Sequence, residues 1–130
     1  MPDDLTVPLG HVLNGRIEHD DGVAMLSLTG EFDLASVAAA DALLAQIEAT
    51  RPRAIAVDLQ ALTFLDSSGV KVLIDAHNRS LGERLFAVLS GSGPPRHALT
   101  ITGVHRFLTV VSSIDELHEL FLAEGAEASE

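Results

Sequence analysis

An unbroken apolar segment near the middle of the chain limits the folds that the sequence can adopt. Residues 54–59 read Ala-Ile-Ala-Val-Asp-Leu, almost without the polar alternation of a half-exposed strand. A strand of this kind is covered on both faces, as in the interior of a sheet with helices on each side. The sequence therefore predicts an α/β protein in which this segment is an interior strand.

The start of a helix follows this strand. Apolar residues recur at helical spacing from Val70 to Leu81, and Asp66-Ser67-Ser68-Gly69 stands directly before them. Asp66 and Ser67 fall where a helix needs its first capping oxygen, and Ser68 falls in or beside the first turn. A hydroxyl at this position is in most proteins only a cap. One cap per helix is enough, however, which leaves Ser68 available for another role.

The rest of the chain alternates between strand and helix patterns. Asp21-Gly22 joins two strand-like runs, where glycine supplies the positive φ of a hairpin turn. Asp33 or Ser36 is the expected cap of the first helix, which reaches about residue 49. Further strands are expected at residues 85–89 and 107–111, and further helices at residues 95–103 and from residue 113 onward.

This order predicts a single-domain α/β fold. Its mixed, mainly parallel sheet has about five strands, opens with an antiparallel hairpin and carries about four packed helices. The expected domain spans residues 10–124, between an extended N-terminal arm at residues 1–9 and a mobile acidic tail at residues 125–130. Sites in such sheets collect beyond the carboxyl ends of the strands, so we expect Asp33, Asp66, Ser67 and Ser68 to come together there.

The charge of the chain narrows the choice of partners. Its formal net charge is −11, with only eight Lys and Arg residues, which argues against nucleic acid and against direct contact with an anionic membrane. Neutral or basic proteins are the expected partners, and a weak homodimer through an edge strand stays open. The sequence has no cysteine, which leaves the redox compartment undetermined. It also has no long apolar run and no basic leader, so we expect a cytoplasmic protein.

No pattern in the sequence indicates an enzyme. A nucleophile elbow requires Gly-x-Ser-x-Gly, and Leu65 stands where its first glycine would be. His77 lies on the apolar face of the helix, more than two turns from Ser68, so we interpret it as a core or boundary residue. The six histidines never pair at the i, i+3 or i, i+4 spacing of a helical metal site. We therefore expect no catalytic residues, no cofactor and no metal.

A serine at a helix start can still act as a switch. Phosphorylation would add about −1.5 to −2 charges beside Asp66, while the helix N-terminus would tolerate the modified side chain. The fold would persist and the surface would change, so a partner docked over this end would be displaced.

Two motifs resemble the STAS-domain anti-sigma factor antagonists of bacteria. They are Gly30-Glu31-Phe32-Asp33-Leu34-Ala35-Ser36 and Leu62-Thr63-Phe64-Leu65-Asp66-Ser67-Ser68-Gly69-Val70. The resemblance covers about residues 12–122 and implies that Ser68 is phosphorylated by an anti-sigma factor that is also a kinase, with Ser67 as second candidate. It also implies that the unmodified protein binds this kinase and releases a sigma factor, and that a phosphatase resets the switch.

The resemblance also implies a docking surface. It places Asp33 and Asp66 near the bound kinase, together with Ser67, Ser68 and Gly69. Lys71 departs from the family pattern, because it puts a charge in the docking helix where many members have small residues or leucine. Some STAS proteins serve transporters or sensory complexes, so a constitutive scaffold or transporter-associated subunit without phosphorylation is the alternative.

Overall fold

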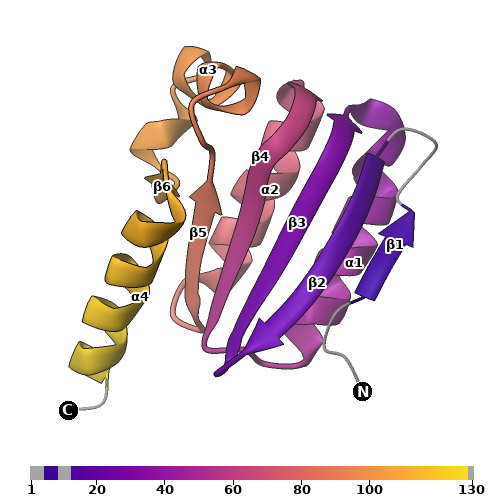
Figure 1. Ribbon diagram of the computed structural model, residues 1–130. Helices are drawn as coiled ribbons and strands as arrows, with labels where there is room; N and C mark the ends of the chain where they lie inside the picture. The colour runs from indigo at the N-terminus through magenta and orange to yellow at the C-terminus, as the bar shows by residue number, and fades with distance from the viewer. Residues whose placement is uncertain (1–4, 9–12, 129–130) are drawn as a thin grey trace.

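The computed structural model describes the backbone of residues 5–8 and 13–128 and the side chains of residues 13–122. Within this part of the chain, six strands form one sheet whose spatial order follows the sequence (Figure 1). They are β1 (Leu5–Pro8), β2 (Leu13–Asp20), β3 (Val23–Phe32), β4 (Ala54–Leu65), β5 (Leu85–Leu89) and β6 (Val110–Val111). The β1–β2 and β2–β3 pairs are antiparallel and the other pairs are parallel, which confirms the predicted fold class.

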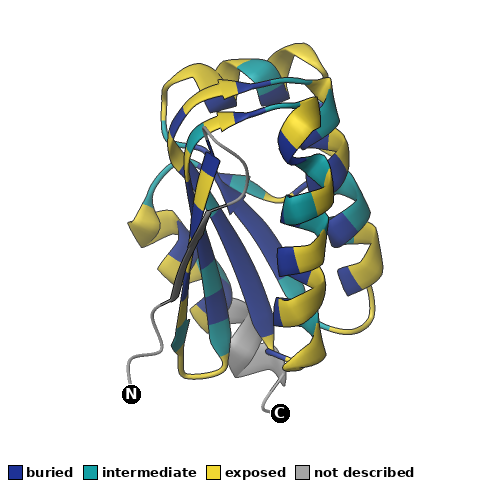
Figure 2. Cartoon of the chain, turned by 90° about the vertical axis from the view of Figure 1, so that its right-hand side faces the viewer, coloured by how far each residue is buried: buried dark blue, intermediate teal, exposed yellow. Residues whose placement is uncertain are grey.

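Helices cover both faces of the sheet. They are α1 (Val37–Ala49), α2 (Ser67–Ser80), α3 (Pro94–Ile101) and α4 (Ile114–Ala128), with the short 3-10 helices η1 (Leu34–Ser36) and η2 (Val104–Arg106). Ile55 and Val57 of β4 belong to the core under α1 and α2. Ala54 and Ala56 belong to a second core, which includes Phe121 of α4. The segment predicted to be covered on both faces is therefore buried on both (Figure 2).

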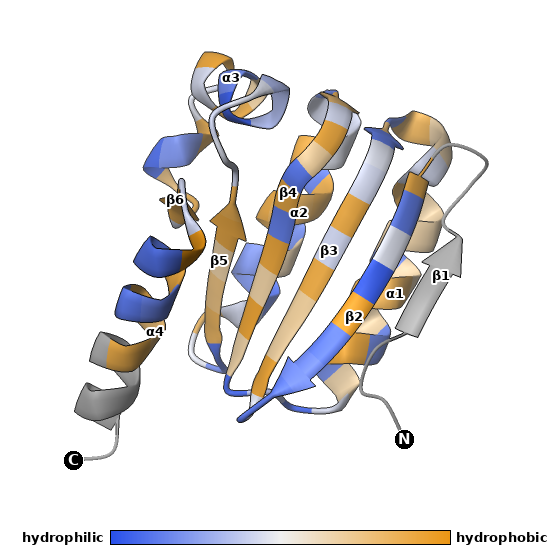
Figure 3. Cartoon of the chain, viewed as in Figure 1, coloured by the Kyte–Doolittle hydropathy of each residue, from blue (hydrophilic) through white to orange (hydrophobic). Residues whose placement is uncertain are grey.

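The hydropathy of the strands reflects their place in the sheet. Hydrophilic and hydrophobic residues alternate along β2, whereas β5 is mostly hydrophobic (Figure 3). The alternation matches burial, since Leu13 and Ile17 of β2 are buried while Asn14 and Arg16 are exposed. One face of β2 therefore packs on the core and the other is open to solvent.

Both ends of the chain contain more regular structure than the sequence predicts. Residues 5–8 of the expected arm form β1, in which Leu5 pairs with Ile17 and Pro8 with Asn14. Helix α4 continues to Ala128 and so includes residues 125–128 of the expected tail, because its Ala and Glu residues favour helix and Gly125 alone does not end it. Residues 1–4, 9, 129 and 130 of the arm and tail lie outside the described residues.

The prediction of a strand at residues 107–111 is wrong for residues 107–109, because β6 contains only Val110 and Val111. Gly103 takes a left-handed conformation with φ of 75° and is followed by η2. The Phe107 and Leu108 amides then donate to the Val104 carbonyl, over 2.8 and 2.9 Å. These local bonds keep the chain in a turn, and pairing with β5 begins only at Val110.

The turn between β2 and β3 and the cap of α4 both form from local residues. Asp21 and Gly22 connect β2 to β3 with φ of 53° and 81°, the positive values of a two-residue hairpin turn. The Ser113 hydroxyl accepts a hydrogen bond from the Glu116 amide over 3.2 Å at the start of α4.

The length of β4 positions the candidate site. Its pairing with β5 ends at Asp58 and Leu89, but β4 continues to Leu65 beside β3. Two register irregularities interrupt this extension before Phe32 pairs with Leu65. Strands β3 and β4 therefore end side by side, beyond the end of β5.

Candidate functional site

The predicted site residues follow the paired ends of β3 and β4. Phe32 and Leu65 are register partners, and the Asp66 amide donates to the Phe32 carbonyl over 3.3 Å. Neighbouring strands lie about 4.8 Å apart, so Asp33 and Asp66 leave the sheet at adjacent positions. The structure thus brings together two segments that lie well apart in the sequence.

Asp66 caps α2. Its backbone is extended, with φ of −102°, and its Oδ1 atom accepts hydrogen bonds from the amides of Ser68 and Gly69, over 2.9 and 3.1 Å. Two of the four free amides of the helix start are thereby satisfied. Of the two predicted capping residues, Asp66 is the cap and Ser67 is the first residue of α2.

Ser67 and Ser68 present hydroxyl groups at the first turn. Ser67 is exposed and Ser68 is half-buried. Within the described part of the chain, neither hydroxyl has a hydrogen-bond partner. The Ser68 amide holds the Asp66 carboxylate, so this serine contributes its backbone to the cap and keeps its side chain uncommitted.

Gly69 lies beneath this surface. It is buried, and a Cβ atom placed on it would lie 2.7 Å from Leu65 Cδ1 and 3.0 Å from Phe32 Cγ. Real Cβ atoms essentially never come as close as 2.7 Å, so a side chain here would force Leu65 or the helix to move. Gly69 therefore serves the site by letting α2 begin close against the ends of β3 and β4.

Lys71 is paired within its own helix. Its Nζ atom lies 2.9 Å from Asp75 Oδ2, one turn further along α2. The hydrogen bond that this ammonium group donates to Asp75, together with the negative charge of Asp75, raises the pKa of Lys71. The positive charge is therefore directed along α2 away from Ser68, and an adjacent carboxylate offsets it.

Asp33 makes the corresponding cap after β3. Its Oδ1 atom accepts from the Ala35 amide over 3.1 Å, and its carbonyl accepts from the Ser36 amide over 3.0 Å. These bonds form η1, which leads directly into α1. Asp33 is half-buried, so it is both a structural cap and part of the surface at this end of the sheet.

Two exposed apolar side chains at this end were not predicted from the sequence. Leu34 is 73% exposed and Phe64 is 46% exposed, although each is next to a capping residue or a buried strand end. No periodic signal marks Phe64, because Leu62 and Leu65 are both buried and so break the strict alternation of a strand. Leu34 carries a signal only as a large apolar residue in the turn after Asp33.

Comparison with known proteins identifies the family. The model of the STAS domain family matches residues 15–117. The chain belongs to the STAS domain family. It is 30% identical over 116 residues to the anti-sigma-F factor antagonist RsfB of Mycobacterium tuberculosis. The aligned residues make up 88% of this chain and 88% of RsfB. The predicted family is confirmed.

Solved structures of the family share this fold. An anti-sigma factor antagonist from Mycobacterium paratuberculosis superposes with a TM-score of 0.76 at 27% identity, covering 86% of this chain and 94% of that one. SpoIIAA in its unphosphorylated form gives a TM-score of 0.65 at 18% identity, covering 82% of this chain and 95% of that one. The Bacillus SpoIIAA in its phosphorylated form gives 0.59 at 19% identity, covering 82% and 98%. At these low identities, the SpoIIAA matches show only the shared fold.

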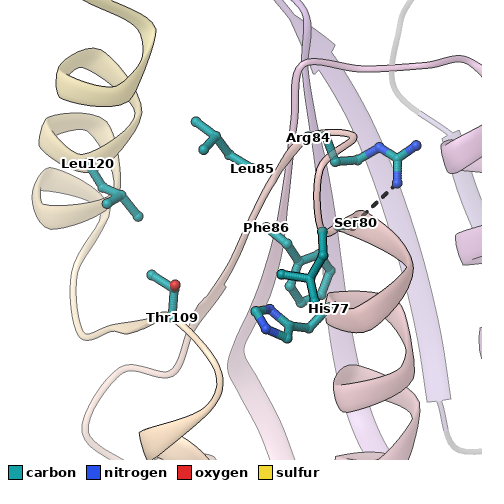
Figure 4. Close-up of a pocket in the computed structure, with 8 residues that line it drawn as sticks. His77, Ser80, Arg84, Leu85, Phe86, Thr109 and Leu120 are labelled. Atoms are coloured by element: carbon teal, nitrogen blue, oxygen red, sulfur yellow. Dashed lines mark hydrogen bonds between the residues drawn. The ribbon is translucent and has the colours of Figure 1, made fainter. Parts of the chain in front are cut away.

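In this STAS domain His77 lies apart from the serines. Its ring meets Phe86 edge-on, with centroids 6.3 Å apart, and lines a cavity of about 170 Å³ with Thr109 and Leu120 (Figure 4). This placement confirms His77 as a core or boundary residue. In the same view, Arg84 Nη1 donates to Ser80 Oγ over 3.3 Å.

The residues that the structure describes contain neither a metal-binding cluster nor a membrane-spanning helix. Among those residues, no group of three or more His, Cys, Asp or Glu side chains could hold a metal ion. Over the same part of the chain, none of the helices is both long enough and apolar enough to span a membrane.

Proposed function

We propose that this STAS domain is an anti-sigma factor antagonist that phosphorylation of Ser68 switches off. In the unmodified state it binds an anti-sigma factor serine kinase, which then releases its sigma factor. The kinase phosphorylates Ser68 and the complex dissociates. A phosphatase that acts on phosphoserine returns the domain to its binding state, and the domain itself catalyses no step.

One observation carries this proposal. The Ser68 side chain is half-buried in the first turn of α2 and its hydroxyl is free of hydrogen bonds to the described residues, while its amide is held by the cap. A kinase can therefore phosphorylate this hydroxyl without breaking a hydrogen bond that stabilises the fold. The similarity to a relative named as an anti-sigma-F factor antagonist supports the same interpretation.

The docking surface combines polar and apolar groups at this end of the sheet. Asp33, Asp66 and Ser67 supply hydrogen-bonding groups, while the exposed Leu34 and Phe64 supply apolar area. Protein interfaces usually have an apolar centre with a polar rim, and these residues offer both. Lys71 lies at the edge of this surface with its charge offset by Asp75.

A phosphate on Ser68 would oppose docking through charge. The Asp66 carboxylate already occupies the Ser68 and Gly69 amides, so these amides cannot also neutralise the new group. About −1.5 to −2 charges would then stand beside a carboxylate at the contact surface. An uncompensated charge buried by a partner costs several kcal/mol, which corresponds to about a thousandfold loss of affinity.

The experiment that tests the proposal locates the phosphate. The protein is incubated with ATP and candidate anti-sigma factor kinases, and the modified residue is identified by mass spectrometry. We expect phosphate on Ser68, none in Ser68→Ala, and normal labelling in the matched variant Ser67→Ala. Label on another residue, or no label with any candidate, would contradict the proposal.

A second readout separates this function from the alternative. A constitutive scaffold or transporter-associated subunit would use the same surface without phosphorylation. Such a protein would co-purify with a membrane complex, and Ser68→Asp would leave that association intact. If Ser68 is a phosphorylation switch, we expect instead that Ser68→Asp abolishes partner binding.

A further inference from the structure

A groove lies at the opposite end of the sheet from Ser68. It has a volume of about 430 Å³ and lies between α4 and the turn end of the β2–β3 hairpin. Its lining includes Val23 and Met25, which open β3, whereas Asp33 follows the other end of the same strand. The ten residues of β3 span about 30 Å, so the groove and the serines do not overlap.

The floor of this groove is apolar. Val23 and Met25 of β3 are half-buried and pack against the core that includes Leu117 and Phe121 of α4. Leu122 also lines the groove and is 72% exposed. Leu122 continues the apolar floor, and an exposed apolar patch with a polar rim is typical of an interaction site.

The rim of the groove is acidic. Glu18, Asp20 and Asp21 line it from β2 and the hairpin turn. Arg53 and His118 are the basic residues of the lining. The Arg53 Nε atom donates to the Asp21 carbonyl over 2.9 Å, and its Nη2 atom lies 3.8 Å from the Asp21 carboxylate. Within the residues that the structure describes, Glu18 and Asp20 form no ion pair. The rim therefore presents negative charge that a partner can neutralise.

We infer that this groove docks a positively charged amphipathic helix of a partner protein. Apolar residues at i, i+3 or i+4, and i+7 of such a helix would lie on Val23, Met25 and Leu122, and flanking Lys or Arg residues would reach Glu18 and Asp20. Opposite charges across the contact favour this occupant and speed its association. The net charge of −11 disfavours a second copy of the chain and an anionic membrane surface in the same place.

The groove gives the domain a contact that does not depend on Ser68. Phosphorylation acts at the far end of β3, several Debye lengths away at physiological salt. The helix partner would therefore stay bound whether or not Ser68 carries phosphate. This inference does not rest on the proposed function, and either can fail without the other.

The test is an NMR titration of the ¹⁵N-labelled full chain with a synthetic 14-residue amphipathic peptide of Lys and Leu. We expect saturable shifts in the amides of Val23, Met25, Leu117 and Phe121, and none at Ser68. A control peptide with Glu in place of each Lys should leave the spectrum unchanged. Shifts spread over the whole acidic surface, or centred on the serines, would overturn the inference.

Matched variants sharpen the test. We expect Leu122→Gln, and separately the double variant Glu18→Gln with Asp20→Asn, to weaken peptide binding at least tenfold. The double variant Glu83→Gln with Asp115→Asn removes the same charge from exposed residues outside the groove and should change affinity less than twofold. Equal losses of peptide affinity in both double variants would show that net charge alone attracts the peptide. Concentration-dependent line broadening without peptide, relieved by Leu122→Gln, would identify a second copy as the occupant. Either result would overturn the inference.

Discussion

The same local turn occurs twice, at the ends of neighbouring strands, with different results. After β3 and after β4 the chain places an aspartate in extended conformation, and each carboxylate accepts from the backbone two residues on. Asp66 also accepts from a second amide, and α2 begins at once. Asp33 accepts from one amide, and η1 intervenes before α1.

The serines of the two turns differ more than their caps. Ser36, after Asp33, is 1% exposed, whereas Ser68, after Asp66, is half-buried with its hydroxyl uncommitted. A strand, an aspartate cap and a nearby serine are thus not sufficient for a modifiable site. Access to the hydroxyl, which depends on how each helix packs, therefore separates the proposed phosphorylation site at Ser68 from the structural turn at Ser36.

The largest expected effect contrasts the two serines directly. Ser36→Asp places a carboxylate in the core, which should lower the free energy of unfolding by at least about 3 kcal/mol. Ser68→Asp changes a half-exposed group and should stay within about 1 kcal/mol of the unmodified protein. Urea denaturation followed by circular dichroism measures both. Equal destabilisation by the two substitutions would show that Ser68 is structural.

A smaller effect tests how closely α2 must approach the sheet. Gly69→Ala forces a methyl group against Leu65 and Phe32, so we expect a loss of about 2 kcal/mol from overpacking. Gly93 precedes α3, and a Cβ atom added to it would meet no other atom within 4 Å, so Gly93→Ala should cost at most about 1 kcal/mol. Thermal unfolding compares the pair, and a larger loss for Gly93→Ala would contradict the packing role of Gly69.

The smallest expected effect compares the contributions of the two capping residues, Asp33 and Asp66, to stability. Asp66→Ala removes an acceptor for two amides and should cost about 1.5 kcal/mol, whereas Asp33→Ala removes an acceptor for one and should cost about 0.7 kcal/mol. Asp66→Asn keeps an oxygen in the same place and should retain most of the stability. The ranking is measured by chemical denaturation, and a reversed order would mean that α2 does not depend on its cap.

Much of this arrangement could be predicted from the sequence, because the patterns that predict it are local. The apolar run in β4, the cap at Asp66 and the hairpin at Asp21-Gly22 each depend on neighbouring residues, and each forms as expected. Features set by tertiary pairing were not predicted. The pairing of residues 5–8 with β2 is one, and the irregular β3–β4 register beside the exposed Phe64 is another.

The candidate site likewise combines features that the sequence predicts with features that depend on tertiary packing. Asp33, Asp66 and Ser68 lie together because parallel strands end at one edge, which strand order predicts. The burial of Gly69 and the pairing of Lys71 with Asp75 depend on packing and rotamers, so neither could be predicted from the sequence. The apolar part of the surface, at Leu34, emerges only once the exposure of each side chain is known.

The central claim is that charge on Ser68 repels a partner while the fold stays intact. One measurement tests it directly: calorimetric titration of the kinase partner into unmodified protein and into protein phosphorylated on Ser68, with the unfolding free energy of both samples. The account predicts about a thousandfold weaker binding after phosphorylation, with stability unchanged within about 1 kcal/mol. Equal affinity in the two states, or a loss of affinity accompanied by unfolding, would contradict it.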